Sequence, residues 1–136
     1  GDRDAWIEEP TGALALVILL DQFPRNIFRN SPQAFATDAK ALAIARTALA
    51  RGDDRIVGED LNAFLAMPLM HSENLADQEA CVEWMETIGG AGNRKAAAEH
   101  CAIIARFGRF PHRNAILGRQ STPEELEFLA SGGFSG

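Results

Sequence analysis

An unbroken apolar segment that ends abruptly in polar residues most constrains how this chain can fold. Residues 13–20 carry no polar side chain, so a helix formed by them is apolar around its whole circumference. Such a helix must be covered on all sides, whereas a surface helix buries only one apolar stripe. Four polar residues follow around Phe23–Pro24, namely Asp21, Gln22, Arg25 and Asn26. Because buried polar groups need hydrogen-bond partners, we expect the rest of the chain to pack around this segment and to supply them.

The composition indicates one globular domain over residues 1–136. Of the 136 residues 46% are hydrophobic, and the net charge of −6 argues against nucleic-acid or membrane binding as the main activity. The apolar segment is too short to cross a bilayer, and the acidic Glu8–Glu9 before it are unlike a signal peptide. Cys81 and Cys101 are expected to be reduced, buried thiols of a cytoplasmic protein, with one disulfide as the alternative.

Apolar residues recur with helical spacing, and no segment alternates apolar and polar residues as a half-buried strand would. The pattern predicts an all-α fold of about six helices joined by short loops. The expected helices cover residues 11–22, 34–51, 59 to a bend or end at Pro68, 75–88, 93–107, and 123 to the glycines at 132–133. The second helix has an alternative start at Thr37–Asp38, after a separate turn over residues 31–36.

Capping signals mark several of these boundaries. The sequence TPEE at 122–125 combines an N-cap threonine, a proline at the first helical position and a capping-box glutamate. Gly52 and Gly108 stand where helix C-caps belong. Asn93 stands where an N-cap belongs.

Two segments share an aromatic-proline motif followed by arginine and asparagine: Phe23–Asn26, and Phe110–Asn114 with one inserted residue. We interpret both as helix ends that use the same device. Proline stops the helix because it disfavours helical backbone in the residue before it. The aromatic ring anchors the turn, and arginine and asparagine bind the exposed carbonyls.

Arginines gather near both motifs. Residues 106–119 contain no acidic residue but hold Arg106, Arg109, Arg113, Arg119 and His112, and the first motif is accompanied by Arg25 and Arg29. Arginine binds carboxylates and phosphates through paired N–H groups, so the cluster is suited to bind an anionic ligand. The alternative is that carboxylates of the chain itself neutralise the arginines inside the fold. Those carboxylates are Asp21, Asp38, Glu73, Glu124 and Glu125.

His71 and His112 are the candidate proton carriers, because histidine titrates near neutral pH. Neither stands beside a nucleophile motif. A metal site formed by these histidines and Glu73 is conceivable but lacks ligand spacing, so we expect no metal and no cofactor. His100 lies on a predicted helix and is expected at the surface.

Gln22 ends the apolar segment, and Gln78 falls on the apolar face of the helix expected over 75–88. Buried amides usually bind backbone groups and fix helix register, which is the simpler interpretation of both. They could instead line a polar pocket with Asp21 and His71. We expect residues 71–73 to supply partners for the polar end of the apolar segment.

Four stretches resemble a known family: LLDQFPRNIFR (19–29), AFATD (34–38), MPLMHSENLADQE (67–79) and RFGRFPHRNAILGRQSTPEELEFL (106–129). They are similar to the bacterial family of uncharacterised proteins called domain of unknown function 924, from about Trp6 to the C-terminus. The resemblance implies an all-helical, right-handed superhelix of the tetratricopeptide-like class. It implies no known activity, substrate or cofactor.

The resemblance also implies a further N-terminal helical stretch, as members of that family usually have, and we expect it to be largely absent from this chain. An apolar face left uncovered by its absence would favour a homodimer or another partner contact.

Three functional hypotheses follow. The first is a small binding module that holds an anionic small molecule or peptide in a pocket lined by arginine and histidine. The second is an enzyme that uses His71 or His112 as acid–base and arginines as anion clamps, and the third is a purely structural polar cluster. The expected ligand-binding residues are Asp21, Gln22, Arg25, Asn26, His71, Glu73, Gln78, Arg106, Arg109, His112, Arg113 and Asn114.

Overall fold

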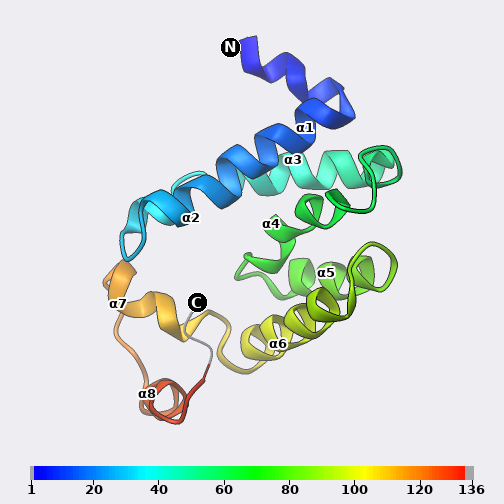
Figure 1. Cartoon of the computed structure of the whole chain (residues 1–136). Coiled ribbons are helices and arrows are strands. Elements are labelled where there is room, and N and C mark those ends of the chain that lie inside the picture. The colour runs from blue at the N-terminus through cyan, green and yellow to red at the C-terminus, as the bar shows by residue number, and fades with distance from the viewer. Residues whose placement is uncertain (1, 134–136) are drawn as a thin grey trace.

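The computed structural model describes residues 2–133, with side chains from residue 5 onward, and contains no β-strand in that range. The predicted all-α class is confirmed (Figure 1). The α-helices are α1 (Pro10–Val17), α2 (Phe23–Ile27), α3 (Asp38–Arg51), α4 (Met67–Met70), α5 (Leu75–Thr87), α6 (Ala91–Phe107), α7 (Asn114–Leu117) and α8 (Pro123–Ala130). The 3₁₀ turns are Asp2–Glu8, Pro32–Phe35, Asp53–Arg55, Asn62–Leu65 and Pro111–Arg113, and Ile18–Gln22 is a π-helical turn. The tetratricopeptide-like array stays a prediction.

α1, the π-helical turn and α2 form one continuous rod, blue in Figure 1. The prediction that Pro24 ends the helix is therefore wrong. In the π turn the Phe23 amide binds the Ile18 carbonyl, five residues back. Pro24 then falls in the first turn of α2, where a missing N–H is tolerated. The Leu20 carbonyl, which an amide at position 24 would bind in an α-helix, instead accepts the Thr37 hydroxyl at 2.5 Å.

The N-terminal half of the rod supplies much of the core. Its buried side chains are Ala13, Leu14, Leu16 and Val17, which pack with residues of α3, α4 and α5. We expected the apolar segment to be buried on every side, but Ala15 is exposed, so this expectation is wrong for the side of the helix that carries Ala15. On α2, Phe23 and Ile27 are 50% and 67% exposed. The expected homodimer stays a prediction.

The start of α3 follows the alternative boundary. The Ser31 hydroxyl accepts the Gln33 amide and caps a separate turn over Pro32–Phe35, so the helix begins at Asp38 rather than near residue 34. It ends as predicted at Gly52, whose positive φ of 87° suits glycine.

Other boundaries confirm or correct the sequence patterns. The capping box of Thr122 with Glu125 is present, as predicted. α6 begins after Gly90, so the expected cap at Asn93 is wrong, although Gly108 ends this helix as predicted. The helix expected from residue 59 is reduced to a 3₁₀ turn and α4, because Pro68 lies in the first turn of α4 and starts a helix there instead of bending one.

Cys81 and Cys101 lie on α5 and α6, which pack against each other. Both are free thiols, as expected. Burial, with a contribution from Cys101, raises the pKa of Cys81 to about 12 and keeps this thiol protonated at neutral pH.

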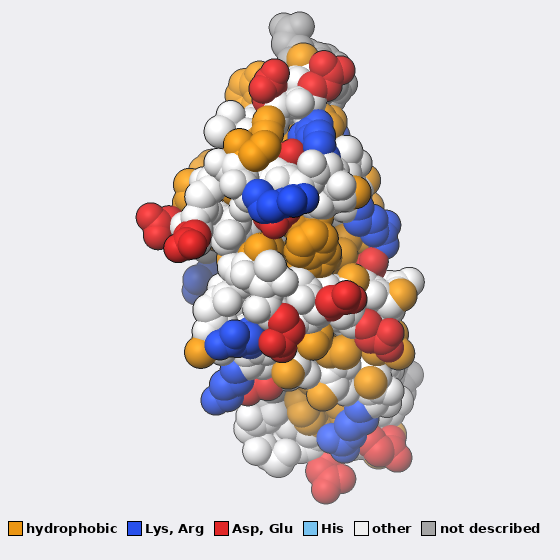
Figure 2. All heavy atoms as spheres, turned by 90° about the vertical axis from the view of Figure 1, so that its right-hand side faces the viewer, with side chains coloured by type: hydrophobic (Ala, Val, Ile, Leu, Met, Phe, Trp, Pro, Cys, Tyr) orange, Lys and Arg blue, Asp and Glu red, His pale blue; other side chains and the backbone are white. Residues whose placement is uncertain are grey.

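The face of the molecule shown in Figure 2 mixes acidic, basic and apolar side chains without a large area of one charge. Among the helices within residues 2–133, none has the length and apolar character needed to cross a membrane. The sequence analysis predicted that residues 13–20 are too short to cross a bilayer. In the structure this segment lies largely in the core or at its edge.

Replacing Thr37 by valine tests how the π turn is stabilised. Valine keeps the shape but removes the hydroxyl that satisfies the Leu20 carbonyl, so the free energy of unfolding should fall by about 1–3 kcal/mol. Thr37 makes no capping bond at α3, so no cap is lost. Thr47→Val is the matched control, because this exposed hydroxyl binds only a carbonyl of its own helix. Equal urea midpoints for the two variants would contradict this account.

Candidate functional site

A pocket of about 400 Å³ lies where the C-terminal end of the rod meets the segment around α7. Figure 1 shows α7 below the end of α2, and the Arg113 guanidinium contacts the Phe35 ring across this junction. The residues that line the pocket are Arg25, Asn26, Arg29, Asn30, Ala34, Phe35, His71, His100, Phe110, His112, Arg113 and Ile116. They come from α2 and the loop after it, the turn Pro32–Phe35, the loop after α4, α6, and residues 110–117.

His71 joins the pocket to a buried carboxylate at the end of the π turn. Its Nδ1 lies 2.8 Å from Asp21 Oδ1, and Asp21 itself has no exposed surface. The Gln22 amide donates to Asp21 Oδ2 at 2.7 Å. Asp21 therefore finds a partner in the segment where the sequence led us to expect one. Asp21 and Gln22 lie behind the pocket wall and do not line it.

The charge of Asp21 determines which nitrogen of His71 carries a hydrogen. Burial alone would raise the pKa of Asp21, but the hydrogen bond and charge of His71 and the charge of Arg25 hold it below the ordinary value of 3.8. An ionised carboxylate only accepts hydrogen bonds, so His71 Nδ1 must donate. Nε2 binds no residue within 2–133 and is the nitrogen left for a ligand.

Arg25 is neutralised by carboxylates of the chain. Its Nη1 lies 3.2 Å from Asp21 Oδ1 and 2.7 Å from Asp38 Oδ1, and its Nη2 lies 2.9 Å from Asp38 Oδ2. This two-pronged contact fastens α2 to the first turn of α3. Of the two interpretations of the arginine cluster, neutralisation by carboxylates of the chain itself is therefore the one observed for Arg25.

Glu73 fastens the second aromatic-proline motif to the loop after α4. Its carboxylate accepts the Phe110 amide at 2.6 Å and two N–H groups of Arg119 at 2.9 and 3.1 Å. Arg119 also donates to Asn114 Oδ1 at 3.0 Å. Glu73 and Asn114 thus support the pocket wall without lining it.

The sequence led us to expect that the two motifs end their helices in the same way, but in the structure they do not. In the first, Arg25 and Asn26 do bind carbonyls of the preceding turn, at Asp21 and Gln22, but the helix continues. In the second, Arg113 donates to a carbonyl in a distant loop. The difference arises because the π turn accommodates Pro24 within the rod, whereas α6 has already ended before the second motif.

Arg113 is a buried cation without a carboxylate in direct contact. It is 7% exposed and lines the pocket. A guanidinium has five N–H donors, yet the single hydrogen bond that Arg113 makes within the described chain goes from Nη2 to the His71 carbonyl, at 2.9 Å. Its Nε is buried and has no partner among residues 2–133. Its Cζ lies 4.4 Å and 4.7 Å from the ring centres of Phe35 and Phe110.

Burial, reinforced by the neighbouring Arg25 charge, lowers the pKa of Arg113 to about 10. The group is still protonated at neutral pH. Unfilled donors on a buried charge are costly, and an anion placed beside the guanidinium would offset that cost.

His100 and His112 complete the pocket as neutral groups. The expectation that His100 lies at the surface is wrong, because its Nδ1 lies 2.7 Å from the Ala96 carbonyl and its ring packs edge-on against Phe110 at 5.5 Å. Burial lowers the pKa of both histidines, and that of His112 falls to about 4 with a contribution from Arg113. His112 is therefore a weak proton acceptor at neutral pH.

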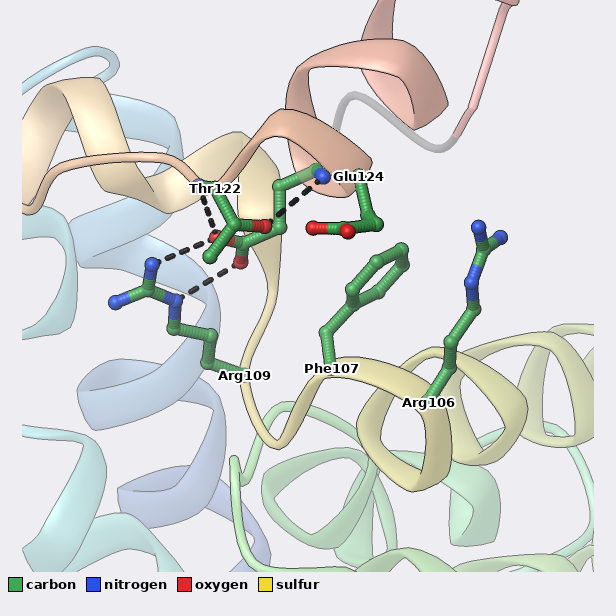
Figure 3. A pocket seen from close by; sticks show the side chains of 6 residues that line it. Arg106, Phe107, Arg109, Thr122 and Glu124 are labelled. Carbon is green, nitrogen blue, oxygen red and sulfur yellow. Dashed lines mark hydrogen bonds and ion pairs between the residues drawn. The ribbon is translucent and has the colours of Figure 1, made fainter.

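Arg106 and Arg109 line a different hollow, of about 510 Å³, shown in Figure 3. The Arg109 guanidinium binds both oxygens of Glu125, at 2.9 and 2.7 Å, and Glu125 also belongs to the capping box of α8. Arg106 packs over the Phe107 ring at 4.5 Å, on the other side of that ring from Arg109 in Figure 3. Because its Arg109 and Glu125 bind each other, this hollow is the weaker candidate.

Gln78 has the structural role expected of a buried amide. Its Nε2 donates to the Met70 and Ser72 carbonyls at 2.6 and 2.7 Å, and it does not line the pocket. It holds the end of α4 and the following loop against α5.

The pocket gathers only part of the predicted set. The predicted residues that line it are Arg25, Asn26, His71, His112 and Arg113. The lining residues that sequence reasoning missed are Arg29, Asn30, Ala34, Phe35, His100, Phe110 and Ile116. Several of them belong to the four stretches that carry the family resemblance, and this was the sequence signal that could have identified them. No three His, Cys, Asp or Glu side chains within the described residues are grouped to hold a metal ion.

Removing the Asp21 carboxylate should destabilise the fold. Asp21→Ala deprives three donors of their acceptor, and we expect a loss of about 2–4 kcal/mol, since Arg25 keeps Asp38. Asp60→Ala, at an exposed carboxylate, should change stability by less than about 0.5 kcal/mol.

Because the pKa of Asp21 is lowered on folding, its stabilisation is present above pH 3.8 and is lost as pH falls below that value. The difference between wild type and Asp21→Asn in urea melts should therefore shrink below about pH 4, and a loss under about 0.5 kcal/mol for Asp21→Ala at pH 7 would contradict the account.

Comparison with known proteins shows which family this chain belongs to. The chain resembles the solved structure of a protein of unknown function, ATU0120, from Agrobacterium tumefaciens, with 45% sequence identity and a TM-score of 0.92. That similarity covers 96% of this chain and 74% of the other. No curated protein sequence matches. The family model described as bacterial protein of unknown function (DUF924) matches residues 1–133, and this chain belongs to that family.

Proposed function

We propose that the pocket binds a small anionic molecule and that Arg113 is the principal cation for it. The observation that carries the proposal is a buried, protonated guanidinium in a pocket wall with one hydrogen bond to the described chain. The other arginines of residues 106–119 bind Glu125 and Glu73 or pack on Phe107. Their pairing leaves Arg113 as the buried arginine suited to an external anion.

The surroundings of Arg113 support this proposal. Arg29 is exposed, lines the pocket and makes no ion pair with any residue from 2 to 133, so it would add to the attraction of an anion. His71 leaves Nε2 open because Asp21 binds Nδ1, and this nitrogen can accept a hydrogen bond from a donor group of the ligand. The volume of about 400 Å³ suits a small molecule.

The test is thermal shift followed by calorimetric titration with benzoate, phenyl phosphate and inorganic phosphate. We expect at least one anion to raise the melting temperature, with a stabilisation of about 2.7 kcal/mol at one hundred times its Kd. Arg113→Met should abolish that shift and Arg29→Met should weaken it. Arg94→Met, at an exposed position on α6 outside the pocket, should leave it unchanged.

Arg113→Met could fold poorly, so Arg29→Met, at an exposed site, is the second variant that keeps the test decisive. Circular dichroism and urea melts establish whether each variant is folded. Anion shifts that are equal in wild type, Arg113→Met and Arg29→Met would overturn the proposal. So would the absence of any shift with all three anions.

A second candidate is an enzyme in which His71 transfers a proton. The contact of 2.8 Å to a buried carboxylate favours it, because this arrangement orients the imidazole ring. His112 is less suited, given its pKa of about 4. Once a ligand is found, His71→Gln separates the candidates. Loss of turnover with binding retained would support the enzyme, whereas no turnover by wild type would favour a binding module.

A further inference from the structure

We infer that the ligand is a monoanion with one carboxylate group attached to an apolar body, which Arg113 holds through its N–H edge. The inference rests on the proposed anion binding and narrows it to a chemical class. It follows from three features of the pocket: its balance of charges, the surroundings of the guanidinium, and the apolar part of the lining.

The charges around the pocket leave room for one negative charge. Arg25 contacts Asp21 and Asp38, and the charge of Glu73 is taken up by Arg119. Asp38 and Glu73 act on Arg113 only from beyond hydrogen-bond distance.

Of the arginines and carboxylates described above, Arg113 and Arg25 are together balanced by Asp21 and Asp38. The exposed Arg29 at the pocket then leaves one uncompensated positive charge. A carboxylate carries one negative charge at neutral pH, whereas a phosphate ester carries about 1.5 to 2. The charge balance therefore favours a carboxylate.

The surroundings of Arg113 restrict how a ligand can approach. Its Cζ lies over two aromatic rings, those of Phe35 at 4.4 Å and Phe110 at 4.7 Å. Aromatic rings in such contacts occupy space beside the guanidinium plane, and the donors lie within that plane. A planar carboxylate can lie in the same plane and accept two N–H groups. A tetrahedral phosphate would direct further oxygens toward the rings, where they find no donor.

The remaining lining fits an apolar body. Ala34, Phe35, Phe110 and Ile116 contribute to the wall of a pocket of about 400 Å³. Burying apolar ligand surface against these side chains would add affinity that acetate cannot obtain. The carboxylate could belong to a free acid or to the C-terminus of a peptide, and the two sources share this chemistry.

The experiment measures Kd by calorimetry at pH 7 and fixed ionic strength. The probes are benzoate, its neutral counterpart benzamide, acetate, phenyl phosphate, and the N-acetylated tripeptide Ala-Ala-Phe as free acid and as C-terminal amide. Benzoate should bind at least tenfold more tightly than acetate and phenyl phosphate, and benzamide should give no measurable binding. Stronger binding by the tripeptide acid than by benzoate would support the inference and identify a peptide terminus as the source of the carboxylate. Stronger binding by benzoate would support the inference and identify a free acid as the source.

Arg113→Lys supplies the second arm, because lysine keeps the charge and loses the paired N–H edge. We expect at least a tenfold loss of benzoate affinity, with no change in the control Arg94→Lys. Unchanged benzoate affinity in Arg113→Lys would overturn the inference. Tighter binding of phenyl phosphate than of benzoate, lost in Arg113→Met, would also overturn it but leave the proposed anion binding intact. Failure of every anion to bind would overturn both.

Discussion

Asp21 accepts hydrogen bonds from His71, Arg25 and Gln22 and has no exposed surface. Through these contacts one carboxylate links the rod, the loop after α4 and, by way of Arg25 and Asp38, the start of α3. The His71 backbone in turn holds Arg113, whose guanidinium donates to its carbonyl. The position of the two groups assigned to ligand binding, His71 Nε2 and Arg113, therefore depends on Asp21 being present and ionised.

The π-helical turn places Asp21 and the residues after it. A turn with bonds to the fifth preceding residue contains an extra residue, which shifts the phase of the helix beyond it. The same turn lets Pro24 lie inside the rod, with the Thr37 hydroxyl binding the Leu20 carbonyl. Arg25 and Asn26 consequently lie on a helix beside the pocket, and Arg29 follows in the loop after it. A helix that ended at Pro24 would not be expected to carry them there.

Local signals explain what could be predicted from the sequence. Helical periodicity, the TPEE capping box and Gly52 depend on neighbouring residues, and all three predicted correctly. The need of Asp21 for a partner also follows from its place beside an apolar segment. The π turn was not predictable in this way, because the hydroxyl that supports it comes from Thr37, far along the chain.

The candidate site was harder to predict for the same reason. Whether an arginine is neutralised depends on which distant carboxylate reaches it: Glu125 reaches Arg109 and Glu73 reaches Arg119, but no carboxylate in residues 2–133 makes direct contact with Arg113. The burial of His100 depends on packing against Phe110, which no helical pattern reveals. The sequence therefore indicated the kinds of residue in the site more reliably than the individual ones.

The most direct test of this account is the protonation of His71, read from ¹⁵N chemical shifts of its ring by NMR as the pH is varied. Since an ionised Asp21 can only accept, we expect the neutral tautomer of His71 to carry its hydrogen on Nδ1. Asp21→Ala should remove that preference. A neutral His71 with its hydrogen on Nε2 in the wild type would contradict the proposed role of Asp21, and with it the availability of Nε2 to a ligand.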